Sequence, residues 1–559
     1  MTLDTRSFSA IGRRDIVALI ALGLIAVGVP LGMSAAAGAI GVPSNDDWVY
    51  MIGATSLFRT GVIDMPGHTA ASIGQLVMVQ PLLWLSGGAN WAFTAFGLAM
   101  GLVVVVSAYL LARRFVGTGS AVLAVAVVLA YPGLARHMAT FMTDVPAWAF
   151  STVCLLLGVR WLQGDGGRLT LIASTVTGIL AVSIREFAVA APAAILVAGW
   201  ARNRPGERSL LAAATAALAA GIGLTLVLAG SLSSRGTLAA SVSISLYSAP
   251  AFMTLAAALL PVLAVAVGRR IKDLQPVHLI AGSALVAMGM VAVPEGPFLG
   301  NIWTRSGVLG DSMLSGARDQ VIAPRLWVLS EQLALFSSGL LAALILRWGW
   351  RRLYRVGSPP GVLAAALEVA TSREGPLVLF LLAYAAELAV FGSLFPLLDR
   401  YFFPMIPPLA ILLLRPFGST APARSLAFSH AALAWLIASA LPLAANSFAY
   451  DAARWRAGEA AVAMGYAPQT VDAGYEWVGA HQARVDSAAA HSFGLTWYDD
   501  LLPSVRPCAV LSNSPLDKPR LALIRVDPSA YRQYILVGPE EPLFLYGFTD
   551  AGCSAQRTP

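Results

Sequence analysis

Acidic side chains beside apolar segments are the first feature of this chain that points to chemistry. Asp46 and Asp47 follow directly after the first long apolar segment. Further polar residues at the ends of apolar segments are Asp144, Arg185, Glu186, Asp399, Arg400 and Tyr401. Carboxylates beside a membrane are costly and are usually retained for a function, so these residues are candidates for an active site.

Helix capping is the alternative explanation for the acids. Asp46 would cap a surface helix over residues 48–58, with Trp48 and Tyr50 as interfacial anchors. Asp144 lies two residues before a proline and is typical of a helix start. Arg185 would form an ion pair at the membrane interface, and Arg400 would snorkel from a helix end. Both explanations are compatible with the sequence.

The composition assigns the chain to a membrane. Of its 559 residues, 57% are hydrophobic and 12% are charged, which excludes an ordinary soluble protein of this length. Windows of about 20 apolar residues predict about thirteen transmembrane helices. Their cores are residues 16–40, 91–111, 120–135, 145–162, 169–183, 187–200, 210–232, 250–267, 277–293, 326–346, 375–398, 403–414 and 426–446. The first follows several arginines and has no cleavage site, which predicts a retained helix.

The distribution of arginine gives an orientation for these helices. Arginines concentrate in alternate loops, which predicts that those loops and the amino terminus are cytoplasmic. Thirteen helices then place the carboxyl terminus on the exoplasmic side, together with all the acids and arginines named above. We therefore expect an all-α polytopic membrane bundle over residues 1–448 and a small α/β exoplasmic domain over residues 449–559. The basic net charge of +7 follows from the cytoplasmic loops and implies no nucleic acid.

The carboxyl-terminal segment and the outer loops carry further signals. Short apolar runs at residues 521–526 and 534–537 predict strands. Cys508 and Cys553 fit either a disulfide or two free thiols. In the outer loop 43–90, the apolar run 73–85 is too short to cross a membrane and predicts an interfacial or re-entrant helix. The outer loop 294–325 fits either a lid over a substrate or an ordinary surface loop.

Four short motifs in this order resemble the GT-C glycosyltransferases, specifically the bacterial protein mannosyltransferase (family 39) and lipid A aminoarabinose transferase group. The motifs are Asp46-Asp47-Trp48-Val49-Tyr50, Phe141-Met142-Thr143-Asp144-Val145-Pro146, Arg185-Glu186, and Arg400-Tyr401 with Pro404 and Pro407. Asp47 stands where such enzymes commonly have Glu. Each motif is weak alone, but their order and shared membrane face strengthen the resemblance.

The resemblance implies an inverting transfer of a sugar from a polyprenyl-phosphate donor to a glycan, lipid or protein acceptor at the exoplasmic face. Asp46 or Asp47 would be the base that takes the acceptor proton. Asp144 would hold the acceptor, orient Arg185 or share a divalent metal with Asp46. Arg400 and Arg185 would hold the donor phosphate. Supporting residues would be Glu186, Tyr401, Trp48 and Tyr50. This function places the chain in the bacterial inner membrane.

The sequence leaves several points open. No cofactor is certain, and a divalent metal (Mg²⁺ or Mn²⁺) held by the carboxylates stays an alternative. A transporter or flippase of a lipid-linked sugar is the competing function, although such proteins usually place ionisable groups near the midplane of the membrane. The sugar, the acceptor and the oligomeric state are not specified by any motif.

Overall fold

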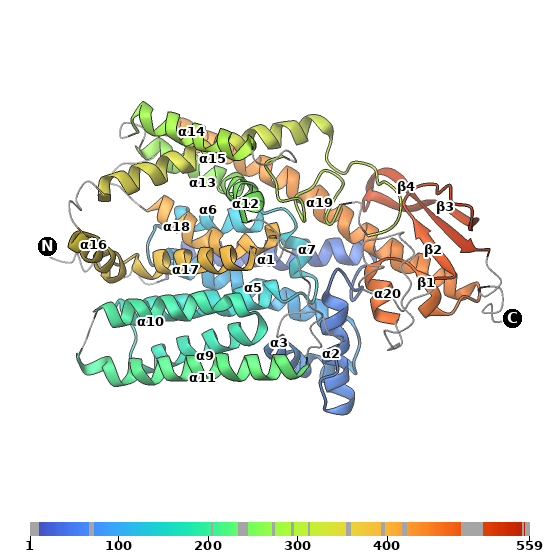
Figure 1. The fold of residues 1–559 in the computed structure, drawn as a ribbon, viewed down its shortest axis with the longest axis horizontal. Coiled ribbons are helices and arrows are strands. Elements are labelled where there is room, and N and C mark those ends of the chain that lie inside the picture. Colours follow the sequence, from blue (N-terminus) through green and yellow to red (C-terminus); the bar gives the residue numbers. More distant parts are fainter. Residues whose placement is uncertain are drawn as a thin grey trace.

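A helical bundle and a small sheet at one of its ends make up the fold in a computed structural model (Figure 1). The structure describes residues 11–65, 72–202, 205–232, 244–270, 274–291, 296–310, 313–353, 359–392, 397–415, 422–481, 507–549 and 553. Helices suit a bilayer because they satisfy their own backbone hydrogen bonds. The predicted combination of a membrane bundle with a small α/β unit is confirmed in these general terms.

Six described helices are long and apolar enough to cross a membrane. They are α1 (Arg13–Ala37), α5 (Trp91–Arg113), α8 (Asp144–Leu162), α11 (Arg208–Leu232), α15 (Pro324–Leu353) and α19 (Ala423–Ala463). A seventh span results if α12 (Ile244–Ala258) and α13 (Leu260–Arg270), which meet at an angle of 77°, are counted as one. Near the centre of the bundle, α5 packs against α1, α6 and α8.

Shorter helices complete the bundle. They are α6 (Thr118–Leu129), α9 (Arg168–Ile184), α10 (Ala190–Arg202), α14 (Pro276–Val291), α16 (Pro359–Thr371), α17 (Gly375–Gly392) and α18 (Ile406–Leu414), with the 3-10 helices η1 (Glu186–Val189), η2 (Pro205–Glu207) and η4 (Asp399–Met405). Each of the thirteen predicted segments contains a helix. The count of thirteen spans is nevertheless unconfirmed, because helices such as α18, with 9 residues, are shorter than a bilayer requires.

The segment predicted to be the first outer loop, a name kept below, contains short helices beside the bundle. They are α2 (Asp47–Thr60), α3 (Ile73–Met78) and α4 (Gln80–Ser86). The last two replace the single helix predicted over residues 73–85, with a break at Val79. A further short helix, α7 (Leu134–Met138), precedes Asp144. Gly97 of α5 lets this connection approach closely, because a Cβ there would lie 2.5 Å from the carbonyl oxygen of Thr140.

The sheet follows the long helix α19. Its strands are β1 (Val471–Asp472), β2 (Ala509–Ser512), β3 (Leu521–Tyr534) and β4 (Val537–Phe548), joined by η5 (Pro468–Thr470) and α20 (Tyr475–His481). The strand order is β1-β2-β4-β3, with β1 and β2 parallel and the other pairs antiparallel. Cys508 and Cys553 form a disulfide. The single strand predicted at residues 534–537 is wrong, because Tyr534 ends β3, Val537 begins β4, and the two residues between them form the turn.

Two predicted features of this region take a different form in the structure. The boundary expected between residues 448 and 449 lies inside α19, which continues without a break. The described part of the loop 294–325 is not an ordinary surface loop. Trp303 is fully buried beside Trp435, and Ser315 bridges to Ser512 of β2. This loop therefore forms packed structure between the bundle and the sheet.

Candidate active site

A pocket between α8, η1, α17 and η4 contains three of the seven charged residues that the sequence singled out. Its wall includes Asp144, Arg185, Arg400 and Tyr401, with Tyr384 and Trp148 as aromatic neighbours. These residues come from four separate segments of the chain. The fold therefore brings three of the predicted motifs to one place.

Arg400 is held at this pocket by the residue before it. The Asp399 carboxylate accepts hydrogen bonds from the backbone N–H groups of Ile302 and Trp303, at 2.7 and 2.8 Å. Asp399 is fully buried. Its role is thus to fix the start of η4 against the loop at residues 296–310, which fixes the backbone position of Arg400.

Arg185 and Asp144 form the most direct ion pair of the pocket. Arg185 lies where α9 ends, and its Nη1 donates to Asp144 Oδ1 at 2.7 Å and to Thr143 Oγ1 at 3.0 Å. Its guanidinium also lies 4.7 Å from the ring centroid of Tyr401. The second oxygen, Asp144 Oδ2, is 4.0 Å from Arg400 Nε. Both of these atoms are buried, and neither has a hydrogen-bond partner among the described residues.

Asp46 completes the group from the first outer loop. Its Oδ2 is 3.6 Å from Arg400 Nη2, and its Oδ1 accepts a hydrogen bond from the Tyr475 hydroxyl at 3.1 Å. The Asp46 side chain is 29% exposed, whereas that of Asp144 is 5% exposed. Asp46 is therefore the carboxylate of this group that an incoming molecule reaches more easily.

Asp47 points elsewhere. Its Oδ1 accepts from the backbone N–H of Ser44, and its Oδ2 accepts from that of Phe141 at 3.4 Å. The residue is 1% exposed, and burial raises the pKa of its carboxyl well above the usual 3.8. Asp47 thus ties the first outer loop to the segment before α8 and does not line the pocket.

The supporting residues occupy different positions. Trp48 and Tyr50 are buried, at 2% and 3% exposed, so the alternative that they anchor the protein at a membrane surface is wrong. Trp48 packs edge-on against Tyr475, while burial and the nearby charge of Asp46 raise the pKa of Tyr50. Glu186 begins η1 and is partly exposed, outside the pocket wall. The capping alternative also lacks support at Asp46, whose side chain makes no capping hydrogen bond with α2.

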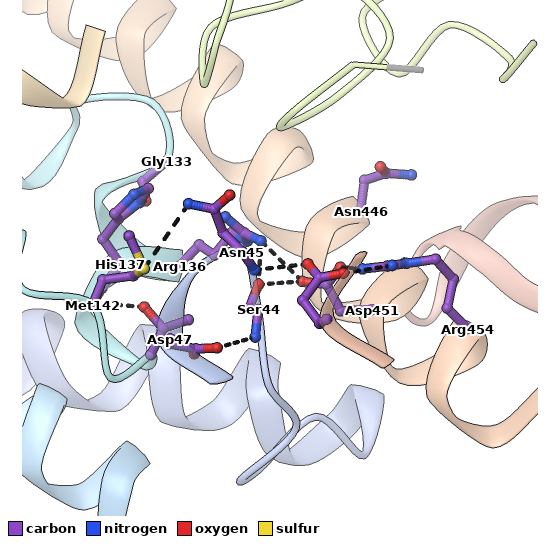
Figure 2. A network of polar contacts seen from close by, with 12 residues as sticks. Ser44, Asn45, Asp47, Gly133, Arg136, His137, Met142, Asn446, Asp451 and Arg454 are labelled. Carbon is purple, nitrogen blue, oxygen red and sulfur yellow. Dashed lines mark hydrogen bonds and ion pairs between the residues drawn. The ribbon is translucent and has the colours of Figure 1, made fainter. Parts of the chain in front are cut away.

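A buried polar network holds the first outer loop in place (Figure 2). Asp451 of α19 lies between Arg136 and Arg454, with contacts of 3.2 and 2.7 Å. It also accepts a hydrogen bond from the Ser44 hydroxyl at 2.6 Å. All four side chains are buried, so their charges and hydrogen bonds depend on one another.

The network continues into α20, which lies between β1 and β2 in the chain. Arg454 Nη1 donates to Glu476 Oε2 at 2.8 Å, and Glu476 Oε1 accepts from the backbone N–H of Asn45 at 2.7 Å. Asn45 itself has a positive φ of 56°, a conformation that Asn tolerates better than most residues. Asp46 is therefore positioned from two sides, through Asn45 before it and Tyr475 opposite it.

Sequence reasoning missed the network residues Arg136, Asp451 and Arg454. One signal was present, because Arg136 is an arginine in a loop predicted to be exoplasmic, where arginine is less common. Asp451 and Arg454 were assigned to a soluble tail, where a charged pair three residues apart is unremarkable. Their importance follows from burial, which the sequence pattern does not show.

The structure also bears on the open question of a metal. Within the described residues no group of three or more His, Cys, Asp and Glu side chains is placed to hold a metal ion. Asp144 of the pocket and Asp46 beside it both contact Arg400 instead. The positive charge beside these carboxylates is thus supplied by a guanidinium of the chain.

No protein family model matches this chain, and no curated protein matches it in sequence. Solved structures similar to it include ArnT from Cupriavidus metallidurans bound to undecaprenyl phosphate, at 12% identity and a TM-score of 0.41, over 96% of this chain and 98% of that one. The apo state of the same ArnT is similar at 14% identity and a TM-score of 0.40, over 97% and 99%.

The oligosaccharyltransferase of Archaeoglobus fulgidus in the apo form is similar at 12% identity and a TM-score of 0.42, over 89% of this chain and 64% of that one. Likeness at these identities and TM-scores assigns no activity to the chain.

Proposed function

We propose that this chain is an inverting membrane glycosyltransferase that moves a sugar from a polyprenyl-phosphate donor to an acceptor hydroxyl at the exoplasmic face of a bacterial inner membrane. The observation that carries the proposal is the pocket lined by Asp144, Arg185 and Arg400, together with the contact between Arg400 and Asp46 beside it. Two opposed buried atoms there, Asp144 Oδ2 and Arg400 Nε, lack hydrogen-bond partners among the described residues, as expected of groups that a ligand satisfies.

Asp46 is the base in this proposal. Its carboxylate takes the proton of the acceptor hydroxyl while the hydroxyl oxygen attacks the anomeric carbon from the face opposite the phosphate. Its greater exposure favours this role over that of Asp144, which is committed to Arg185. Asp47 is the less suitable candidate, because both of its oxygens accept backbone hydrogen bonds in the interior.

Arg400 and Arg185 receive the leaving group. The bond between the anomeric carbon and the phosphate oxygen breaks with its electron pair on the phosphate, whose negative charge grows. A guanidinium offers several N–H groups in one plane and is suited to phosphate oxygens. Asp144 keeps Arg185 in place and prevents two neighbouring cations from standing unpaired before the donor binds.

The test compares envelope glycans and glycolipids, by mass spectrometry, from cells with wild-type protein and cells with single variants at matched expression. Asp46→Asn should abolish the modification that depends on this protein. Asp165→Asn is the matched control, because Asp165 is 40% exposed and pairs with Arg114 away from the pocket. Unchanged glycans with Asp46→Asn would contradict the assignment of the base.

The same preparations separate transfer from transport. Membrane vesicles that contain wild-type protein should move labelled sugar from the lipid-linked donor to an acceptor in the vesicle extract. Accumulation of unaltered donor on the opposite leaflet without transfer would instead support the flippase alternative and overturn the proposal.

A further inference from the structure

The hairpin formed by β3 and β4 has an apolar tip. Strand pairing ends with Tyr534 opposite Val537, so Ile535 and Leu536 form a two-residue turn. Leu536 is 74% exposed and Val537 is 63% exposed. Two-residue hairpin turns normally carry Gly, Asn or Asp, and large exposed apolar side chains at such a turn need a separate explanation.

The tip is fixed beside the end of α1. Ile535 has a positive φ of 68°, which is rare for a β-branched residue. Together with Met33 and Ala37 of α1, it packs against an apolar cluster that includes Phe448 of α19. The hydroxyl of Tyr534, the residue before the turn, donates to the backbone carbonyl of Val321 at 2.8 Å. Packing therefore holds Ile535 inward and leaves Leu536 facing out.

The length of α1 gives the depth of this position in a membrane. The helix begins at Arg13 and exposes large apolar side chains such as Ile20, at 58%, and Leu24, at 68%. A hydrocarbon core of about 30 Å takes about 20 residues of helix, so a span that starts near Ile16 reaches the opposite boundary near residue 36. The last turn of α1, and the hairpin tip beside it, then lie at the level of the lipid headgroups.

We infer that the β3–β4 hairpin tip inserts into the membrane surface and that Leu536 and Val537 contact lipid where headgroups and acyl chains meet. Ile535 packs against the same cluster as the last turns of α1, and the rest of α1 exposes large apolar side chains, which is why lipid is the partner that fits the tip. This contact anchors the sheet to the membrane at a point separate from α19. The inference concerns a different surface from the pocket and does not depend on the proposed reaction.

Fluorescence of a dye on a single cysteine tests this contact. Of the native cysteines, Cys154 is buried and Cys508 and Cys553 are bonded, so an introduced thiol is labelled selectively. We would label Leu536→Cys in the full chain with the dye NBD and reconstitute it in phosphatidylcholine vesicles. Leu523→Cys is the control. Leu523 is 53% exposed on β3 and lies roughly 35 Å from the tip at about 3.3 Å per residue.

The expected result is a blue-shifted emission at position 536 and quenching by doxyl-labelled lipid several-fold stronger than at position 523. Val537→Cys should behave like Leu536→Cys, which guards against a local effect of one substitution. Emission at 536 that matches that at 523 would place the tip in water and overturn the inference. A blue shift without quenching by doxyl lipid would mean that protein covers the tip, and this would overturn it as well.

Discussion

Arg400→Gln gives the sharpest test of the pocket, because it removes a charge and leaves most of the surrounding structure intact. Asp144 keeps its ion pair with Arg185 at 2.7 Å in the variant. Asp46 is partly exposed and keeps the hydrogen bond from Tyr475. The substitution therefore acts mainly on whatever negative group binds beside the unpartnered Nε of Arg400.

The expected size of the effect follows from the kind of bond that is lost. A hydrogen bond to a charged group contributes about 1.5–3 kcal/mol. The Coulomb energy of two unit charges about 4 Å apart, at an effective dielectric constant near 20, is roughly 4 kcal/mol and sets an upper limit. Arg400→Gln should thus weaken the binding of a phosphate-bearing lipid by about 10- to 150-fold. Arg400→Lys, which keeps the charge but loses the planar fork, should fall in between.

The assay is a binding titration of purified protein in detergent with undecaprenyl phosphate and, separately, with undecaprenol. Only the first lipid carries the phosphate, so Arg400→Gln should weaken its binding and leave that of undecaprenol unchanged. Arg415→Gln is the matched control, because Arg415 is 48% exposed and pairs with Glu374 at 2.9 Å. Equal affinity of wild type and Arg400→Gln for undecaprenyl phosphate would refute the assignment of Arg400 to the donor phosphate.

Three further predictions concern the residues around the pocket. Tyr475→Phe removes the hydrogen bond to Asp46, which contributes about 0.5–1.5 kcal/mol. The rate at which glycans appear after induced expression should therefore fall about 3- to 10-fold. An unchanged rate would show that this bond does not position Asp46. Asp451→Ala leaves two buried guanidinium groups without their shared carboxylate and should lower stability in thermal unfolding by about 3–5 kcal/mol. Glu540→Gln is the control, because Glu540 belongs to an exposed ion pair, and it should lower the stability by less than about 1 kcal/mol. Equal losses of stability in the two variants would contradict the account of the network. Because the pKa of Asp47 is raised in the folded state, wild-type protein loses stability as the pH rises from 3.8 toward that pKa. Asp47→Asn does not titrate, so the melting temperature of the variant should rise relative to that of wild type as the pH increases. A difference in melting temperature that stays constant with pH would contradict the raised pKa of Asp47.

The sequence predicted the broad architecture because hydrophobicity is a local signal. Each predicted span contains a helix, and the apolar run at residues 73–85 is helical although too short to cross a bilayer. The number of spans was not predictable with the same precision. Breaks such as the 77° bend between α12 and α13 depend on packing, and a hydropathy window does not detect them.

The pocket was predictable in part for a similar reason. Arg185 and Arg400 were found because charge is rare beside apolar segments, and the structure places both at one pocket with Asp144. The choice between Asp46 and Asp47 was beyond the sequence, because adjacent residues of the same type differ only in the direction of their side chains. Their partners, Arg400 for one and backbone N–H groups for the other, exist only in the folded chain.

Because α19 continues without a break toward the sheet, the orientation of the sheet depends on the number of residues in this helix. At 41 residues the helix is about 62 Å long, roughly twice the thickness of a hydrocarbon core. One residue added between Asn446 and Asp451 would turn everything after it by about 100° and move Asp451 away from Arg136. An insertion of four residues, close to one full turn, would bring the angle back to within about 40°. In this chain a change of length inside one helix therefore acts as a rotation of the sheet, whereas the same change in a loop would be absorbed where it occurs.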